Sequence, residues 1–248
     1  MQTKREILIS GTLAMFFGGC CSCNSADAAI GCSLSISAAA PYIKDIQDAE
    51  RIRDPFVLKS GNRDFDFATA QSLSRMSEVF KVLPSFRYFK FGNSDNAFAT
   101  PIKIDQGRDG SILFGRDLLF KLMAKEEGPE TAFAAVLAHE YGHILQFKLG
   151  INNILQQQAK NVRASELHAD FLSGYFAGIR KLEMPDFKAA IFAVNQYSVG
   201  DYEASSNEHH GTPEERARSV VMGFKTAYNE KLPLMDAVLF GAKYVLSI

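Results

Sequence analysis

One short segment of the chain combines residue types that can hold a metal ion and use it for hydrolysis. His139, Glu140 and His143 follow the pattern H-E-x-x-H. On a helix the two histidines stand one turn apart on the same face, because positions i and i+4 are neighbours there. Both imidazoles can then bind one Zn2+ ion, and Glu140 can take a proton from a water molecule held by that ion. The pattern predicts a hydrolytic zinc site; the alternative is a helix whose histidines only cap or hydrogen-bond in the core.

A catalytic zinc ion usually has three protein ligands and one open position. No third histidine follows His143 at the spacing H-E-x-x-H-x-x-G-x-x-H, so the third ligand must come from elsewhere in the chain. Glu166 and Asp170 are again an i, i+4 pair, in a segment with many apolar neighbours, which argues against a solvated acidic face. We expect Glu166 to complete the ligand set and Asp170 to accept a hydrogen bond from a zinc-binding histidine. His168 points away from that face and is expected to be a surface or packing residue.

The elements expected to position these residues are mostly helices. Pro129 suits the first turn of the helix that carries the two histidines, and Gly150 suits its end. An aromatic segment and a turn-rich hairpin predict a small antiparallel sheet. We therefore expect an α+β fold, mostly helical, in a single domain over residues 41–248. The expected helices are 42–53, 67–83, 116–125, 128–149, 163–181, 186–198 and 213–228, and the expected strands are 86–91, 97–104 and 111–114.

The composition limits the class of protein and its partners. Hydrophobic residues make up 47% of the 248 residues and charged residues 22%, which is ordinary for a globular protein and excludes a wholly disordered chain. The formal net charge is -1, so no basic excess is available to neutralise phosphates, and we expect no nucleic-acid partner.

The amino terminus has the features of an export signal. Lys4 and Arg5 precede an apolar run from 7 to 19, which is too short to span a bilayer, and Ala28 ends an A-x-A-like cleavage site. We expect a signal peptide over residues 1–28, a flexible linker over 29–40, and a periplasmic or secreted protein. One alternative is lipoprotein processing with a lipid anchor at Cys20; another is a disordered cysteine-bearing tail on a cytosolic protein. The mature body has no apolar run of the roughly 20 residues that an integral membrane helix needs.

The motifs together resemble a known family. The segments 139–143 (HEYGH) and 166–170 (ELHAD) are similar to those of the gluzincin zinc metallopeptidases. The segments 96–99 (NAFA) and 210–216 (HGTPEER) resemble motifs of compact relatives of the CAAX prenyl proteases and the heat-shock membrane protease, and the second also resembles the bacterial neutral zinc metallopeptidases. The resemblance spans residues 94–216. The membrane branches of this family have several spans, which this body lacks, so prenylated substrates are not expected.

The resemblance implies a zincin-like fold with one Zn2+ per chain and roles for three more residues. Asn96 would begin an edge strand along the active-site cleft, to which a peptide adds by main-chain pairing, and would hold the substrate. His210 would donate to the oxyanion, and Arg216 would be a supporting charge beside it. The alternative for Asn96 is a turn residue.

Several residues compete with His210 for this role. His209 is its direct rival, and the sequence does not separate the two. Tyr197 and Tyr202 are weaker candidates. The alternative for His210 is a loop residue before a helix capped by Thr212.

The expected function is zinc-dependent hydrolysis of internal peptide bonds in a polypeptide substrate. One alternative is a catalytically idle zinc-fold protein that binds peptides or acts like a chaperone; the intact Glu140 argues against it, since such a protein needs no base. Another is a zinc amidase that acts on cell-wall peptide.

Overall fold

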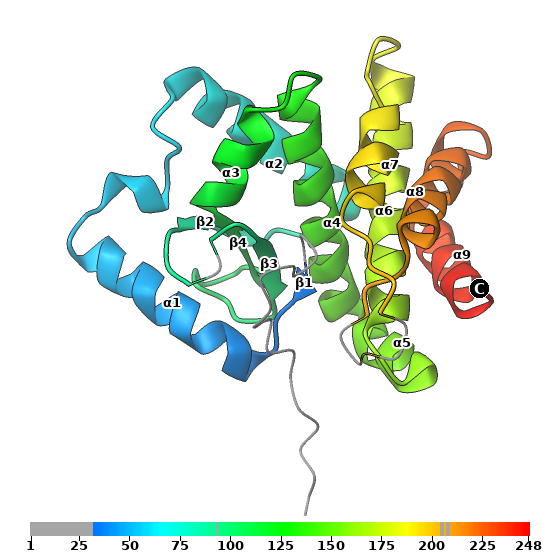
Figure 1. Ribbon diagram of the computed structural model, residues 1–248, viewed down its shortest axis with the longest axis horizontal. Coiled ribbons are helices and arrows are strands. Elements are labelled where there is room, and N and C mark those ends of the chain that lie inside the picture. The colour runs from blue at the N-terminus through cyan, green and yellow to red at the C-terminus, as the bar shows by residue number, and fades with distance from the viewer. Residues whose placement is uncertain (1–31, 93, 204–205, 207–208) are drawn as a thin grey trace, which may run out of the picture.

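The structure is a computed structural model that describes residues 32–92, 94–203, 206 and 209–248 (Figure 1). The expected signal peptide over 1–28 and Cys20 lie outside these residues. The elements run in the order β1 (Cys32–Ser33), α1 (Ile36–Arg51), a 3-10 turn (Pro55–Val57), α2 (Arg63–Phe80), β2 (Ser85–Phe89), β3 (Ala97–Thr100), β4 (Ser111–Gly115), α3 (Arg116–Met123), α4 (Pro129–Leu149), α5 (Ile151–Ala159), α6 (Arg163–Glu183), α7 (Ala190–Tyr197), α8 (Pro213–Tyr228) and α9 (Leu234–Leu246).

The chain is mostly helical with one small sheet, as the sequence predicts for an α+β fold. Every predicted helix and strand is present, with ends that shift by a few residues. Helices α5 and α9 were not predicted. Helix α5 follows directly after Gly150, which ends α4 with φ 70°. Helix α9 has buried residues at helical spacing, Ala237, Val238, Gly241 and Val245, so its signal was present in the sequence.

The sheet is mixed, and the expectation of an antiparallel sheet is wrong. Its strand order is β1-β3-β4-β2. The hairpin of β3 and β4 is antiparallel as expected, but β2 pairs with β4 in parallel. All five residues of β4 are buried, which suits a central strand with a neighbour on each side. β2 and β3 thus lie on opposite sides of β4, although they follow each other in the sequence.

The two faces of the sheet are covered by different helices (Figure 1). Phe89, Phe98 and Leu113 pack with Ile43 and Ile46 of α1. The alternate residues of the same strands, among them Ala99 and Phe114, belong to the main core with α2, α3 and α4, since side chains along a strand point to opposite faces. Beyond α4, away from the sheet, lie α6, α8 and α9 (Figure 1). Helix α4 thus lies between the sheet and the helical half, which explains why its apolar residues are buried on every side.

The strand β3 is not at an edge of the sheet, which corrects a second expectation. Cys32 and Ser33 of β1 pair in parallel with Phe98 and Ala99. The backbone N–H of Leu34 continues this pairing and donates to the carbonyl of Ala99 at 2.8 Å. Since β4 occupies the other side, both sides of β3 are paired within the chain.

The expectation of a flexible linker over 29–40 is wrong for the part that the structure describes. Helix α1 begins at Ile36, and the hydroxyl of Ser35 caps it by accepting from the N–H of Ala38 at 3.2 Å. Leu34 and Ala39 are buried in the cluster that α1 forms with the sheet. Pro41, expected to open the folded body, lies inside α1.

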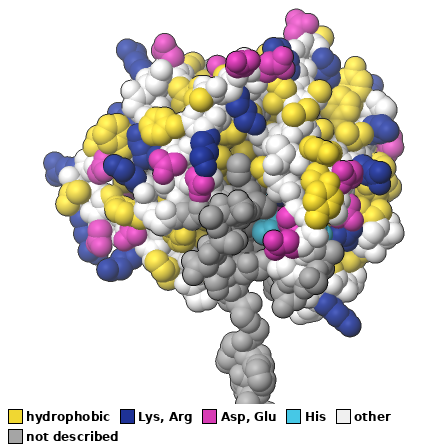
Figure 2. Space-filling model, in the orientation of Figure 1, with side chains coloured by type: hydrophobic (Ala, Val, Ile, Leu, Met, Phe, Trp, Pro, Cys, Tyr) yellow, Lys and Arg dark blue, Asp and Glu magenta, His cyan; other side chains and the backbone are white. Residues whose placement is uncertain are grey.

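None of the helices in the described part of the chain is long and apolar enough to cross a membrane. On the face shown in Figure 2, basic and acidic side chains are interspersed with apolar ones, in keeping with the net charge of -1.

Candidate metal centre

Two long helices bring the candidate ligands together. Helix α4 carries His139 and His143, and its residues 135–146 are all buried. Helix α6 carries Glu166, and its residues 164–178 are all buried. Both helices are therefore held by packing on all sides, which fixes the direction in which these polar side chains point.

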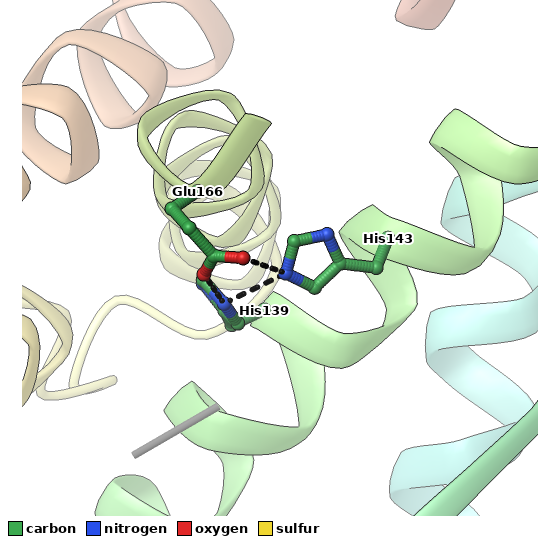
Figure 3. Close-up of side chains that lie close together, drawn as sticks. All are labelled: His139, His143 and Glu166. Atoms are coloured by element: carbon green, nitrogen blue, oxygen red, sulfur yellow. Dashed lines mark hydrogen bonds and ion pairs between the residues drawn. The ribbon is translucent and has the colours of Figure 1, made fainter. Parts of the chain in front are cut away.

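The three ligand atoms converge as the i, i+4 spacing predicts (Figure 3). The Nε2 atoms of His139 and His143 are 3.1 Å apart. The carboxylate of Glu166 lies 3.2 Å from His139 Nε2 and 3.3 Å from His143 Nε2. All three residues are at most 1% exposed.

These distances fit a tetrahedral zinc ion. Ligand atoms about 2.0–2.2 Å from such an ion lie roughly 3.3–3.6 Å from one another. The observed 3.1, 3.2 and 3.3 Å are close to that range. Two histidines and one glutamate are also a ligand set that catalytic zinc uses. The residues present therefore fit the expected cofactor, a single Zn2+ ion.

Gly142 allows the two helices to approach this closely. A Cβ atom at this position would lie 3.1 Å from the Cα and 3.2 Å from the carbonyl oxygen of Ala169 on α6. Both are backbone atoms of a buried helix and cannot move aside easily. Gly142, between Glu140 and His143, thus sets the spacing between α4 and α6.

Asp170 lies behind His139, as predicted for one of the two histidines. Its Oδ1 lies 2.8 Å from His139 Nδ1, which donates to it and leaves Nε2 to face the cluster. Arg216 of α8 donates to the same carboxylate from Nε at 2.8 Å and from Nη2 at 3.1 Å. Gln196 of α7 donates to Asp170 Oδ1 at 2.6 Å. Arg216 was predicted as a supporting charge near His210; its direct partner is Asp170.

Charge interactions link the three candidate ligands of the cluster and Asp170. Burial lowers the pKa of His139, but Asp170 and Glu166 outweigh it and raise that pKa to about 10. Burial would raise the pKa of Glu166, but His143 and His139 hold it well below its usual value. Both ring nitrogens of His139 thus face a carboxylate, with Asp170 at Nδ1 and Glu166 at Nε2.

Glu140 differs from the other polar residues of the centre. It is fully buried, and neither oxygen of its carboxylate has a hydrogen-bond partner among the described residues. Burial raises its pKa to about 7, and the nearby charges that act on it include those of His139, His143, Glu166 and Arg216. Buried carboxylates are normally hydrogen-bonded, and Glu140 is an exception. Because both of its oxygens are unpaired among the described residues, they can accept a proton from a molecule beside the cluster.

The structure separates the two neighbouring histidines of the late motif. His209 Nδ1 pairs with Asp201, whereas His210 Nε2 is buried and has no hydrogen-bond partner among the described residues. Burial lowers the pKa of His210, and the charge of Glu166 acts on it next most strongly. His209 and His210 are 3% and 5% exposed. A small histidine surface is visible beside acidic side chains in Figure 2. The charge of Glu166 therefore reaches His210, and the oxyanion role of His210 stays a prediction.

Four further candidates have contacts of other kinds. Asn96 is buried directly before β3, and its side-chain oxygen accepts from the N–H of Ala97 at 2.8 Å, so its contact with a substrate stays a prediction. Tyr197 and Tyr202 are 49% and 70% exposed and donate to Glu214 at the surface. His168 is a buried packing residue stacked on Phe171 and not a surface residue, and burial lowers its pKa to about 4.

Sequence reasoning missed the two buried glutamines of the centre. Gln146 contacts His143 Nδ1 at 2.9 Å, and Gln196 contacts Asp170. Gln146 had a usable signal, because it lies three residues after His143 and therefore on the same helix face. Gln196 had none, since only the fold brings α7 to the end of Asp170.

Comparisons with models of protein families, with curated proteins and with solved structures find no match to this chain. The gluzincin resemblance therefore stays a prediction from short motifs. The arrangement of the described side chains is what supports a function.

Proposed function

We propose that the protein is a zinc-dependent endopeptidase of the gluzincin type, with a zincin-like fold. The observation that carries the proposal is the pairing of two features in one buried place. Three metal-binding atoms lie within 4.8 Å of one another, and the carboxylate of Glu140 beside them has no partner among the described residues. A site that only bound metal would have no need of the second feature.

Each residue has a role that follows from its position. When bound, the zinc ion polarises the scissile carbonyl and makes water more acidic. His139, His143 and Glu166 would hold the ion. Glu140 takes the proton from the attacking water and passes it to the leaving amine, for which a pKa of about 7 is well suited. His210 donates from Nε2 to the oxyanion that develops at the carbonyl oxygen of the scissile bond.

The sheet leaves no free side of β3 for a peptide strand, although the motifs imply one. Addition of a peptide strand to β3 requires β1 to leave, because β1 and β4 occupy its two sides. We retain a polypeptide as the substrate and leave Asn96 as a candidate contact. We also propose that the protein is exported, with a lipid anchor at Cys20 as the alternative to simple cleavage after Ala28.

The proposal is tested by metal analysis together with a proteolysis assay. The purified protein is expected to contain one zinc ion per chain and to cleave an unfolded protein. A chelator should abolish cleavage, and added zinc should restore it. Ala in place of His139, His143 or Glu166 should lower zinc content at least about tenfold, because one of three protein ligands is lost.

The same assay separates the alternatives. A protein that keeps zinc but leaves unfolded protein and cell-wall peptide intact would be an idle binding protein. A protein that cleaves the amide of cell-wall peptide but leaves unfolded protein intact would be a zinc amidase. A His143→Ala variant with one zinc ion per chain would contradict the ligand set.

A further inference from the structure

The side chain of Gln146 connects His143 with two residues of α6, Ser165 and His168. It is fully buried on α4, and its amide contacts groups on both sides. On the oxygen side, His143 Nδ1 lies 2.9 Å and the hydroxyl of Ser165 3.1 Å from Oε1. On the nitrogen side, the carbonyl of Ser165 lies 2.8 Å and His168 Nδ1 3.1 Å from Nε2. Every polar atom of this amide is therefore engaged.

The contact with the Ser165 carbonyl fixes which end of the amide faces His143. Shape does not distinguish the two ends of a glutamine side chain, so the hydrogen-bond partners must decide. A backbone carbonyl only accepts hydrogen bonds, so the NH2 group must face Ser165. Oε1 then faces His143, and because this oxygen only accepts, His143 Nδ1 must carry the proton.

His168 secures the amide from the other side. Its Nε2 lies 3.0 Å from the carbonyl of Val238 on α9, which also only accepts, so His168 carries its proton on Nε2. Its Nδ1 is then an acceptor for the second N–H of Gln146. The chain of hydrogen bonds from Val238 through His168 and Gln146 to His143 has one consistent direction.

We propose that Gln146 is a positioning residue that fixes His143 with its proton on Nδ1 and its lone pair on Nε2, directed at the metal. His168 holds Gln146 in this orientation and anchors it to α9. Asp170 does the same for His139, with a carboxylate in place of an amide. The inference rests on the zinc site of the proposed function, but not on the hydrolysis that this site performs.

The test compares substitutions that remove or keep the acceptor oxygen. Gln146→Met is nearly isosteric and removes it, whereas Gln146→Glu keeps an oxygen that can accept from His143. Ser165→Ala is the matched control, because it removes a buried hydroxyl from the same network and leaves the contact between Gln146 and His143. Zinc affinity is measured by competition with a chelator, and circular dichroism checks the fold of each variant.

Gln146→Met is expected to weaken zinc binding about 10–100-fold, the usual effect of losing a residue that orients a ligand. Gln146→Glu should recover a measurable part of the lost zinc affinity. The zinc affinity of Ser165→Ala should stay within about threefold of the wild type, which in free energy is less than half of a tenfold change. Proton NMR of the zinc-loaded protein gives a second readout. The His143 Nδ1–H signal should lie downfield in the wild type and in Gln146→Glu, and should move upfield or broaden by exchange with water in Gln146→Met.

Each other outcome has a definite meaning. Zinc binding by Gln146→Met within about threefold of the wild type overturns the inference and leaves the proposed function intact. Equal losses in Gln146→Met, Gln146→Glu and Ser165→Ala assign a merely structural role to the network and also overturn it. If Gln146→Met does not fold, the inference is overturned when Gln146→Glu lacks the downfield Nδ1–H signal. A wild-type protein that binds no zinc contradicts the metal site itself, and the inference falls with it.

Discussion

The two sides of the centre differ in how their buried polar groups are satisfied. On the ligand side, His139 donates to Asp170 and His143 to Gln146, so each ring nitrogen that does not face the cluster has a partner. On the other side, which we call the reaction side after the proposed function, both oxygens of Glu140 and Nε2 of His210 are buried without a hydrogen-bond partner among the described residues. An unpaired buried polar group costs about 1–3 kcal/mol, so the reaction side is held in this state by the packing around it.

From this difference we expect the two sides to determine different properties of the protein. The ligand side is complete within the chain and can bind an ion without a substrate. Under the proposed function, groups from outside the chain complete the reaction side, namely the attacking water and the oxyanion of the substrate. Substitutions on the ligand side should therefore change metal affinity or folding, and those on the reaction side should change turnover.

The largest expected effect is that of Glu140→Gln. It keeps the shape of the side chain and removes the base, so turnover should fall by about 10²–10⁴-fold while zinc content stays at one ion per chain. Glu130→Gln is the matched control, because it makes the same chemical change at an exposed position on the same helix. Cleavage of an unfolded protein and zinc content are measured for both. If Glu140→Gln cleaves as fast as the wild type, Glu140 is not the base.

Arg216→Met is expected to act on folding. It leaves the buried Asp170 carboxylate without its two hydrogen bonds from the guanidinium, and breaking such a pair costs about 3–5 kcal/mol. The free energy of unfolding is measured by denaturant titration of the metal-free proteins. Arg218→Met, at an exposed position of the same helix, should change it by no more than about 0.5 kcal/mol. A similar small value for Arg216→Met would mean that the pair does not stabilise this side.

His210→Ala is expected to act on turnover alone. Loss of one oxyanion donor typically lowers kcat by about 10²–10³-fold, and zinc content should not change. His209→Ala is the paired variant and should be much milder, since His209 is engaged with Asp201. The opposite result would exchange the roles of the two histidines. If both variants turn over normally, neither histidine is the donor and the late motif is structural.

The smallest expected effect is that of Thr212→Ala. The Thr212 hydroxyl accepts from the N–H of Glu215 at 3.2 Å, and the Glu215 carboxylate accepts from the N–H of Thr212 at 3.0 Å. Loss of this cap should cost about 1 kcal/mol of unfolding free energy, and Thr212→Ser should retain most of it. Zinc affinity should stay unchanged in both, because this helix start contributes no ligand. A large loss of zinc from Thr212→Ala alone would show that the two sides are coupled through α8.

Much of the ligand side could be predicted because its information is local. The spacing of His139 and His143 places both on one face of a helix whatever surrounds it, and the same holds for Glu166 and Asp170. Pro129, Gly150 and Thr212 mark helix ends through their own backbone and side-chain chemistry, and the structure has α4 and α8 bounded as these residues predict.

The tertiary structure decided what depends on residues far apart in the sequence. The strand order could not be derived, because β2 pairs with β4 and not with β3, which follows it in the sequence. In addition, β1 occupies the side of β3 on which the motifs predict a substrate. The partner of Arg216 and the difference between His209 and His210 likewise depend on how α8 and its preceding loop pack against α6. The sequence by itself therefore determined which side chains could bind a metal ion. The packing of α4 against α6 and α8 decided which of the remaining polar groups are paired and which are left unpaired, because a buried hydrogen bond depends on distances between helices that no local spacing contains.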